Sequence, residues 1–406
     1  MKNFFRKLLK IPLILRICIG LAAGVLLGLF LPDFTVIGIL GTLFIGALKA
    51  IAPILVFILV ISSLCYAGKG IGKRFTTVII LYMLSTLLAA FVAVAASFIF
   101  PIKVPLAEIS EITNAPHDLG DVFTTLLTGM VQNPISALTN ANYLGILTWA
   151  IFAGLILRKI ASDTTKTLLK DFSDCISKIV SCIIQCAPLG IMGIVFTTIK
   201  TNGIGIFNSY GKLILVLVAC MLIQAIIVNP IIVGICIKKN PFPLVFKCLR
   251  RSAITAFFTR SSAANIPVNM DLCEEMGLDK DYYSVSIPLG ATINMDGAAI
   301  TITIMSLAAA YSIGIEVNFP MALLLSIVAT LGACGSSGVA GGSLLLIPMA
   351  CSLLNVPADV SMQLVSIGFV IGVIQDSMET ALNSSSDVLF TAAAEFREME
   401  KSKSEK

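Results

Sequence analysis

Three carboxylates lie inside an apolar segment near the C-terminal end of the sequence. The segment runs from Leu364 to Phe390, is long enough to cross a bilayer, and contains Asp376, Glu379 and Asp387. Each charge would cost about 2.5–3.5 kcal/mol at the centre of a lipid-facing helix. Because the sum rivals the stability of a typical fold, the polar face of this segment must contact protein, water or a ligand.

The spacing of the polar residues indicates one helical face. Asp376, Thr380, Asn383 and Asp387 form a single stripe at the helical period, and Glu379 lies at its edge. This pattern predicts an amphipathic helix whose polar face binds a ligand or ions. The alternative is a soluble surface helix.

Two breaks rich in Ser and Gly precede spans that contain an aspartate. The first break, 261–265, comes before a span with Asn294 and Asp296, and the second, 332–342, comes before the span with Asp376. The order hairpin, polar helix, hairpin, polar helix is typical of inverted-repeat transporters, whose interrupted segments mark the binding site. The alternative for such stretches is close helix packing.

The tips of the two breaks suit a substrate carboxylate. Backbone N–H groups at the start of a helix attract anions, and we expect this of Ser261 and Ser262 and of the tip 338–343. Glycine lets the backbone approach a ligand closely, and the second tip is also the expected moving gate.

Oxygen ligands near two other polar elements suit a hard cation. Asp296 lies in an apolar span and needs a cation or donors, and carboxylate, carbonyl and hydroxyl oxygens suit Na⁺. Tyr82, Ser85 and Thr86 share one face of the third span. The alternatives are a helix cap for Asp296 and ordinary interhelical hydrogen bonds for the hydroxyls.

Composition identifies an integral membrane protein. The chain has 406 residues, of which 57% are hydrophobic and 13% charged, whereas soluble domains carry roughly 25% charged residues. The net charge of +5 comes from basic residues at the ends of apolar runs, so it indicates no nucleic-acid partner. We expect ordinary spans near Ile11–Leu31, Val36–Cys65, Phe75–Phe100, Val122–Leu157, Cys175–Ile199 and Lys212–Ile237.

Loop charges predict the orientation. Basic clusters at 2–10, 69–74, 158–170 and 238–251 fall on one side if each span crosses once, and that side is cytoplasmic. Both termini are therefore expected in the cytoplasm.

The chain has no sign of enzyme chemistry. The eleven cysteines form no CxxC pair and the chain has one histidine, so a zinc site, a disulfide framework and a histidine-activated nucleophile are not supported. Motifs for nucleotide binding or hydrolysis are missing. A secondary transporter fits best, and a channel or a membrane hydrolase are the alternatives from other classes.

With these residues set out, the chain resembles the dicarboxylate/amino acid:cation symporter family. The resemblance covers nearly the whole chain and rests on the motifs Thr259–Pro267, Asn294–Gly297, Gly338–Gly342 and the stripe from Asp376 to Asp387. It implies an all-α integral membrane fold of the elevator type, with eight transmembrane helices and two re-entrant helical hairpins related as inverted repeats. It also implies a homotrimer in the bacterial cell (inner) membrane.

The resemblance divides the chain into a scaffold and a transport domain. The implied parts are residues 1–72 (scaffold helices one and two), 73–121 (transport-domain helix three and an external loop), 122–205 (scaffold and trimerisation helices four and five), 206–395 (transport domain with helix six, hairpin one, helix seven, hairpin two and helix eight) and 396–406 (cytoplasmic tail).

The resemblance also implies a substrate site. Asp376 is expected to bind the α-ammonium of an amino acid, and Asn383 with the backbone at Ser261 and Ser262 its α-carboxylate. Thr380 lines the side-chain end. The second hairpin closes with backbone at Val339 and Ser343.

Three implied sodium sites use carboxylates and carbonyls. The first has Asp387 with carbonyls of Gly290, Asn294 and Asn383. The second has carbonyls near Thr292 and at Ala333 to Ser336. The third has Asp296 and Asn294 with Tyr82, Ser85 and Thr86. Sodium is the expected co-transported ion, without an organic cofactor.

One departure from the family indicates the substrate. Members that carry acidic substrates have an arginine where this chain has Glu379, and a carboxylate there would repel a second carboxylate. A small neutral amino acid with a hydroxyl fits better, because Glu379 can accept its hydrogen bond. Arg260 is kept and is expected to pair with Glu379 or Asp376. We expect sodium-coupled import of serine and threonine; another neutral amino acid, a dicarboxylate or proton coupling are the alternatives.

Overall fold

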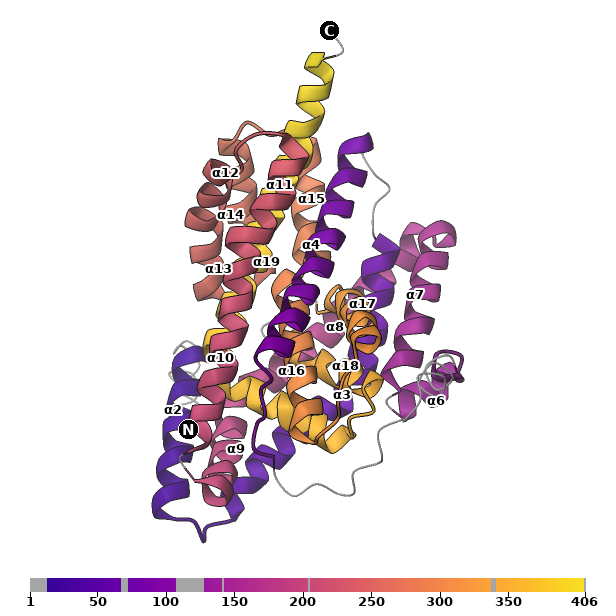
Figure 1. Cartoon of the computed structure of the whole chain (residues 1–406). Helices are drawn as coiled ribbons and strands as arrows, with labels where there is room; N and C mark the ends of the chain where they lie inside the picture. Colours follow the sequence, from indigo (N-terminus) through magenta and orange to yellow (C-terminus); the bar gives the residue numbers. More distant parts are fainter. Residues whose placement is uncertain are drawn as a thin grey trace, which may run out of the picture.

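The computed structural model describes residues 13–66, 72–106, 128–140, 142–203, 205–336 and 341–404. Every regular element in these residues is helical (Figure 1). The helices are α2 Leu13–Phe30, α3 Val36–Tyr66, α4 Gly72–Ile99, α6 Pro134–Thr139, α7 Tyr143–Ile160, α8 Asp163–Gln185, α9 Ala187–Asn202, α10 Ile206–Ile223, α11 Asn229–Ile237, α12 Phe242–Cys248, α13 Ile254–Thr259, α14 Ser262–Glu275, α15 Lys280–Ile293, α16 Asp296–Ser312, α17 Phe319–Ala333, α18 Ile347–Leu353 and α19 Ala358–Ser404, with π-helical η1 Gln224–Val228 and η2 Leu249–Ala253 and the 3₁₀ turn η3 Ser343–Leu346.

Several of these helices are long and apolar enough to cross a membrane. By length and composition, five helical stretches of the described chain qualify, or six if α8 and α9 count as one bent span. The expected all-helical, multi-pass membrane fold is confirmed at this level. The eight crossings stay a prediction.

Two expected spans have a different form in the structure. Residues 175–199 do not make one helix, because α8 already begins at Asp163 and α9 departs from its direction by 53°. The break follows from Pro188, which lies in the first turn of α9 and cannot continue the hydrogen bonds of α8. Within the expected span 122–157, the described part holds the short α6 and all but the last residues of α7, each capped by an asparagine.

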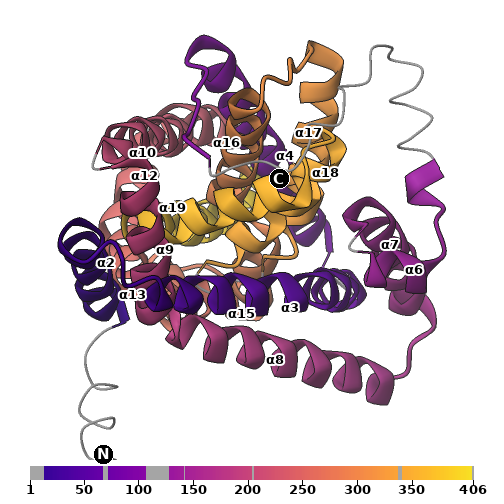
Figure 2. The ribbon, with the colours of Figure 1, turned by 90° about the horizontal axis from the view of Figure 1, so that it is seen from below.

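The helices pack as two groups. In the first helix group α9 lies against α2 and α3, and α3 also contacts α7 and α8 (Figure 2). The second helix group holds α4 and α10 to α19, and α19 contacts most of its members. The groups meet where α19 contacts α9, α18 contacts α7 and η3 contacts α3.

Glycines bring the backbones of the first helix group into direct contact. A Cβ atom at Gly20 would lie 2.1 Å from the Pro188 carbonyl oxygen, and one at Gly193 would lie 2.4 Å from the Gly41 nitrogen. Gly24 and Gly28 approach α9 in the same way. Small residues at such spacings hold membrane helices close together.

Two hairpins point toward the middle of the second helix group. The first (hairpin 1) runs from α12 through η2 and α13 and returns as α14, and the second (hairpin 2) runs from α17 to η3 and α18. Arg260 joins α13 to α14 with φ 52°, a left-handed conformation that is uncommon for a residue with a side chain. α15 and α16 are broken at Asn294 and Met295. α13, α14, α15, α16, α18 and η3 all contact α19.

An ionic cluster joins α4, α15 and α19 of the second helix group. Arg74 of α4 lies 2.9 Å from Asp279 and 3.7 Å from Glu395 of α19, and its guanidinium lies over the Tyr282 ring. The hydrogen bond from Arg74 lowers the pKa of Asp279 below its ordinary value. α4, α15 and α19 are therefore tied together at one end.

We expect Gly193→Ala to destabilise the fold, because its new methyl group would meet backbone atoms of α3. The expected loss in the free energy of unfolding is about 1–3 kcal/mol, measured by thermal unfolding of the purified protein. Gly211→Ala in α10 is the matched control, since a Cβ there meets nothing within 4 Å. Equal stability of the two variants would contradict the packing argument.

Candidate functional site

Asp376 of α19 links the tips of both hairpins. Its Oδ2 atom lies 2.7 Å from Arg260 Nε of hairpin 1, and its Oδ1 atom accepts a hydrogen bond of 3.0 Å from the Gly341 N–H of hairpin 2. The Asp376 carboxylate is almost fully buried. Of the two partners expected for Arg260, the structure selects Asp376. Val339 lies outside the described residues.

Glu379 is surrounded by neutral donors. Thr301 of α16 and Ser343 of η3 donate to its Oε2 atom at 2.7 and 2.8 Å. Gln375 donates to the same atom at 2.6 Å and also to Thr301. No ion pair among the described residues involves Glu379. The sequence did not single out Thr301 or Gln375, although both are polar residues in apolar spans.

Asn383 faces the start of α16. Its Oδ1 atom accepts a hydrogen bond of 2.7 Å from the Gly297 N–H, one of the N–H groups that a helix start leaves without a partner in the helix. Its Nδ2 atom lies 3.4 Å from Met295 Sδ. Thr380 lies one turn from Asp376 and donates to that residue's carbonyl at 2.8 Å.

Asp387 and Asn294 form a buried pair with free oxygen atoms. Asn294 Nδ2 donates to Asp387 Oδ1 at 2.9 Å and contacts the Asn383 carbonyl at 3.2 Å. A Cβ at Gly290 would lie 2.7 Å from Asp387 Oδ1, so only glycine leaves this space. Asp387 Oδ2 and Asn294 Oδ1 are buried without a hydrogen bond. Two unpartnered buried oxygens are the ligand type of a hard cation.

Asp296 is held by hydroxyl and amide donors. Ser85 donates to its Oδ2 atom at 2.7 Å, Asn229 Nδ2 does so at 3.0 Å, and the Thr86 hydroxyl lies 3.3 Å from Oδ1. Gln224 donates to Asn229 and Ser85. Gln224 and Asn229 were not predicted. Gln224 is the first residue of the π-helix η1 and Asn229 directly follows it; such an interruption often marks functional sites.

The Tyr82 hydroxyl contacts residues of α15 and α19. It is 3.2 Å from the carbonyls of both Ser286 and Asp387 and 2.9 Å from the Thr391 hydroxyl. The structure therefore brings Ser85 and Thr86 to Asp296, and Tyr82 to Asp387.

The ends of α15 and α17 also meet. Cys334, just after α17, donates its thiol to the Ile293 carbonyl at 3.5 Å. Ala333 and Ser336 are buried beside this contact, and Thr292 uses its hydroxyl for the Leu289 carbonyl. The last carbonyls of a helix lack partners and carry partial negative charge, so two converging helix ends suit a cation.

Hairpin 1 is fixed to α19 by buried amides. Asn265 and Asn269 of α14 donate to the hydroxyl and carbonyl oxygens of Ser384, and Asn269 accepts from Ser252 of η2 at 2.6 Å. Asn265 was part of the predicted first break without a role of its own, and Asn269 was not predicted; their spacing of four positions was the available signal. Ser261 caps α14 through the Ala264 N–H, and Ser262 Oγ is buried without a partner.

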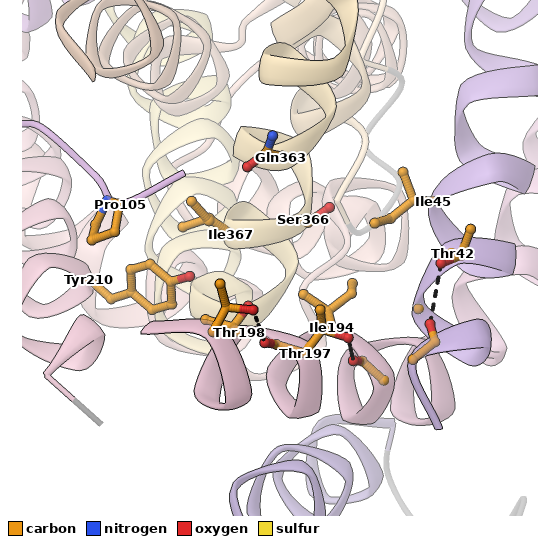
Figure 3. Close-up of a pocket in the computed structure, with 14 residues that line it drawn as sticks. Thr42, Ile45, Pro105, Ile194, Thr197, Thr198, Tyr210, Gln363, Ser366 and Ile367 are labelled. Carbon is orange, nitrogen blue, oxygen red and sulfur yellow. Dashed lines mark hydrogen bonds between the residues drawn. The ribbon is translucent and has the colours of Figure 1, made fainter. Parts of the chain in front are cut away.

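A separate cavity lies between the two helix groups (Figure 3). It measures about 170 Å³ and is bounded by α3, α9, α10 and α19. The hydroxyls of Thr42, Thr197 and Ser366 bond to carbonyls of their own helices. The lining residues carry no charged side chain. The cavity therefore lacks the charges that would hold a zwitterion. Such charges lie further along α19, from Asp376 to Asp387.

Known proteins are similar to this chain over nearly its whole length. The profile of the sodium:dicarboxylate symporter family matches residues 13–395. A serine/threonine transporter SstT of Streptococcus agalactiae is 56% identical over 396 residues, covering 97% of this chain and 98% of the relative. Those of Streptococcus thermophilus (99% and 100% covered) and Bifidobacterium adolescentis (95% and 89%) are 54% identical. The chain belongs to the sodium:dicarboxylate symporter family.

Proposed function

We propose that this protein is a secondary transporter that imports L-serine and L-threonine together with Na⁺. Family membership and the names of relatives with 54–56% identity support this activity. The observation that carries the substrate assignment is the environment of Glu379. A buried carboxylate held by hydroxyl and amide donors excludes an acidic side chain and accepts a neutral, hydroxylated one.

The proposed substrate lies between α19 and the hairpin tips. Its α-ammonium binds Asp376 and displaces the Arg260 guanidinium from Oδ2. Its α-carboxylate binds Asn383 and the N–H groups at the start of α14, next to Ser261 and Ser262. Support comes from α14 beginning at Ser262 and from the buried hydroxyl of that residue, which has no partner.

Glu379 recognises the substrate hydroxyl in this proposal. The donors from Thr301, Ser343 and Gln375 all reach Oε2, which leaves Oε1 to accept from the substrate. A hydrogen bond to a charged group stabilises a complex by about 1.5–3 kcal/mol. Since Ser343 belongs to hairpin 2, this carboxylate joins recognition of the hydroxyl to closure of that hairpin.

Sodium is proposed to bind at the oxygen clusters of α15, α16 and α19. Asp387 and Asn294 offer unpartnered buried oxygens, and Asp296 has two hydroxyls beside it. The converging ends of α15 and α17, at Thr292 and Ala333 to Ser336, give a further proposed position. All of these ligands are oxygens, which suit a hard monovalent cation better than a transition metal.

We also propose an elevator mechanism in a homotrimer with both termini in the cytoplasm. The scaffold would comprise residues 1–72 and 122–205, and the moving part residues 73–121 and 206–395, with 396–406 as a tail. Two observations support this division. Glycine contacts join the helices of the first group backbone to backbone, and α19 joins those of the second group.

We expect Asp376→Asn to abolish serine uptake, because it removes the charge that binds the ammonium group. Loss of one partner of a buried charge pair weakens binding by at least about thirtyfold. The measurement is Na⁺-driven uptake of labelled L-serine into proteoliposomes. Asp359→Asn at the start of α19 is the control. Normal uptake by Asp376→Asn would refute the assignment, and strong competition by aspartate in the wild type would refute the substrate class.

We expect Glu379→Gln to lower the preference for serine over alanine by about tenfold, the lower end of the contribution of a hydrogen bond to a charged group. Competition of both amino acids against labelled serine measures this ratio. The exposed Glu316→Gln is the matched control. An unchanged preference for serine over alanine, with uptake intact, would show that Glu379 does not bind the substrate hydroxyl.

We expect Asp296→Asn and Asp387→Asn to raise the Na⁺ concentration needed for half-maximal serine uptake, because each removes a negative charge from a proposed cation position. The control is Asp281→Asn in the exposed first turn of α15, which should leave the sodium dependence unchanged. Serine uptake driven by a proton gradient alone, without Na⁺, would refute sodium coupling and indicate proton coupling.

A further inference from the structure

An apolar groove follows the outer side of hairpin 1. It measures about 280 Å³ and lies between α10 with η1 on one side and η2 with α13 on the other. Both sides contact α19 (Figure 1). Met378, Ala381 and Leu382 of α19 form its floor. Its rim is exposed, with Ile254 at 55% and Phe258 at 76%. A membrane protein with such a rim presents the groove to lipid.

Basic residues stand at one end of the groove. Lys247 and Arg250 precede the lining residues Ala253 and Ile254 on the same helical arm, and Arg250 lies about one turn before them. Both cations are exposed, and no ion pair within the described chain involves either. The neighbouring Arg251 instead binds Glu275 at 2.7 Å.

The groove has the length of one leaflet of hydrocarbon. Its helical wall runs from Leu249 to Phe258, which spans roughly 14 Å at the rise of a helix. The hydrocarbon core of a bilayer is about 30 Å thick, so the groove matches about half of it. Cations at one end and apolar walls of this length are complementary to the anionic headgroup and the acyl chain of a phospholipid.

We propose that this groove binds one acyl chain of an anionic phospholipid, whose phosphate contacts Lys247 and Arg250. The lipid lies against the back of α19. Met378, Ala381 and Leu382 directly adjoin Glu379, Thr380 and Asn383 in sequence. Glu379 contacts Ser343 of hairpin 2, and Asn383 contacts the start of α16. The bound chain therefore supports the helix that holds the candidate site from its opposite side. This binding does not depend on the proposed transport activity.

The test compares lipids on the purified full-length protein. Phosphatidylglycerol, phosphatidylcholine and free glycerol 3-phosphate are added separately, retained lipid is counted by native mass spectrometry, and the melting temperature is recorded. We expect phosphatidylglycerol to be retained and to raise the melting temperature, and the other two to do so weakly. Equal effects of phosphatidylcholine would refute recognition of the headgroup, and a full effect of glycerol phosphate would refute the role of the groove.

Variants locate the lipid. Arg250→Gln should reduce retained phosphatidylglycerol about fivefold, the contribution of one basic residue near a membrane surface. Arg251→Gln is the matched control, because its charge is already paired and exposed pairs add little stability. Equal loss in both variants would refute the assignment to Arg250.

A third variant tests the acyl chain itself. Ala253→Phe fills the groove and should displace the lipid while Lys247 and Arg250 remain. Retention of phosphatidylglycerol by this variant would refute the acyl-chain position. Cross-linking of Ala253→Cys between two chains would assign the groove to a second copy of the protein instead.

Discussion

The cost of burying charge in a membrane governs the second helix group. Asp376, Glu379 and Asp387 sit along one face of α19, and lipid offers none of them a partner. Each has donors from a different element: the hairpin tips for Asp376, α16 and η3 for Glu379, and the break between α15 and α16 for one oxygen of Asp387, whose other oxygen has no hydrogen bond. The hairpin tips, η3 and the break between α15 and α16 therefore lie where the α19 carboxylates find their donors.

This constraint also explains the contrast between the two groups. Among its described residues, the first group is joined mainly by apolar contacts and by glycines that allow close backbone packing. The second group has an apolar core of its own and adds directional polar contacts between α19 and its neighbours. The proposed elevator mechanism needs such a division, with the closely packed first group as the scaffold and the second group, with its polar contacts, as the moving part.

The sequence predicted the membrane class, the family and the polar stripe of α19, because each rests on charge placed in apolar surroundings. It did not predict which donors meet each charge. Thr301 and Gln375 are single polar residues in long spans, and only the packing of α16 on α19 brings them to Glu379. Gln224 and Asn229 come to Asp296 through the π-helical turn of η1, which has no periodic signature. The bend between α8 and α9 was foreseeable from Pro188, but apolar composition on both sides concealed it.

Arg260 is a cation tethered beside the carboxylate that the substrate ammonium is proposed to occupy. A tethered group competes at a high and fixed effective concentration, so the affinity observed for a free amino acid is its intrinsic affinity reduced by the share of molecules in which Asp376 is already paired. The left-handed backbone of Arg260 fixes where this competitor enters. In the proposed site, the Arg260 guanidinium is thus an internal competitor for the central carboxylate.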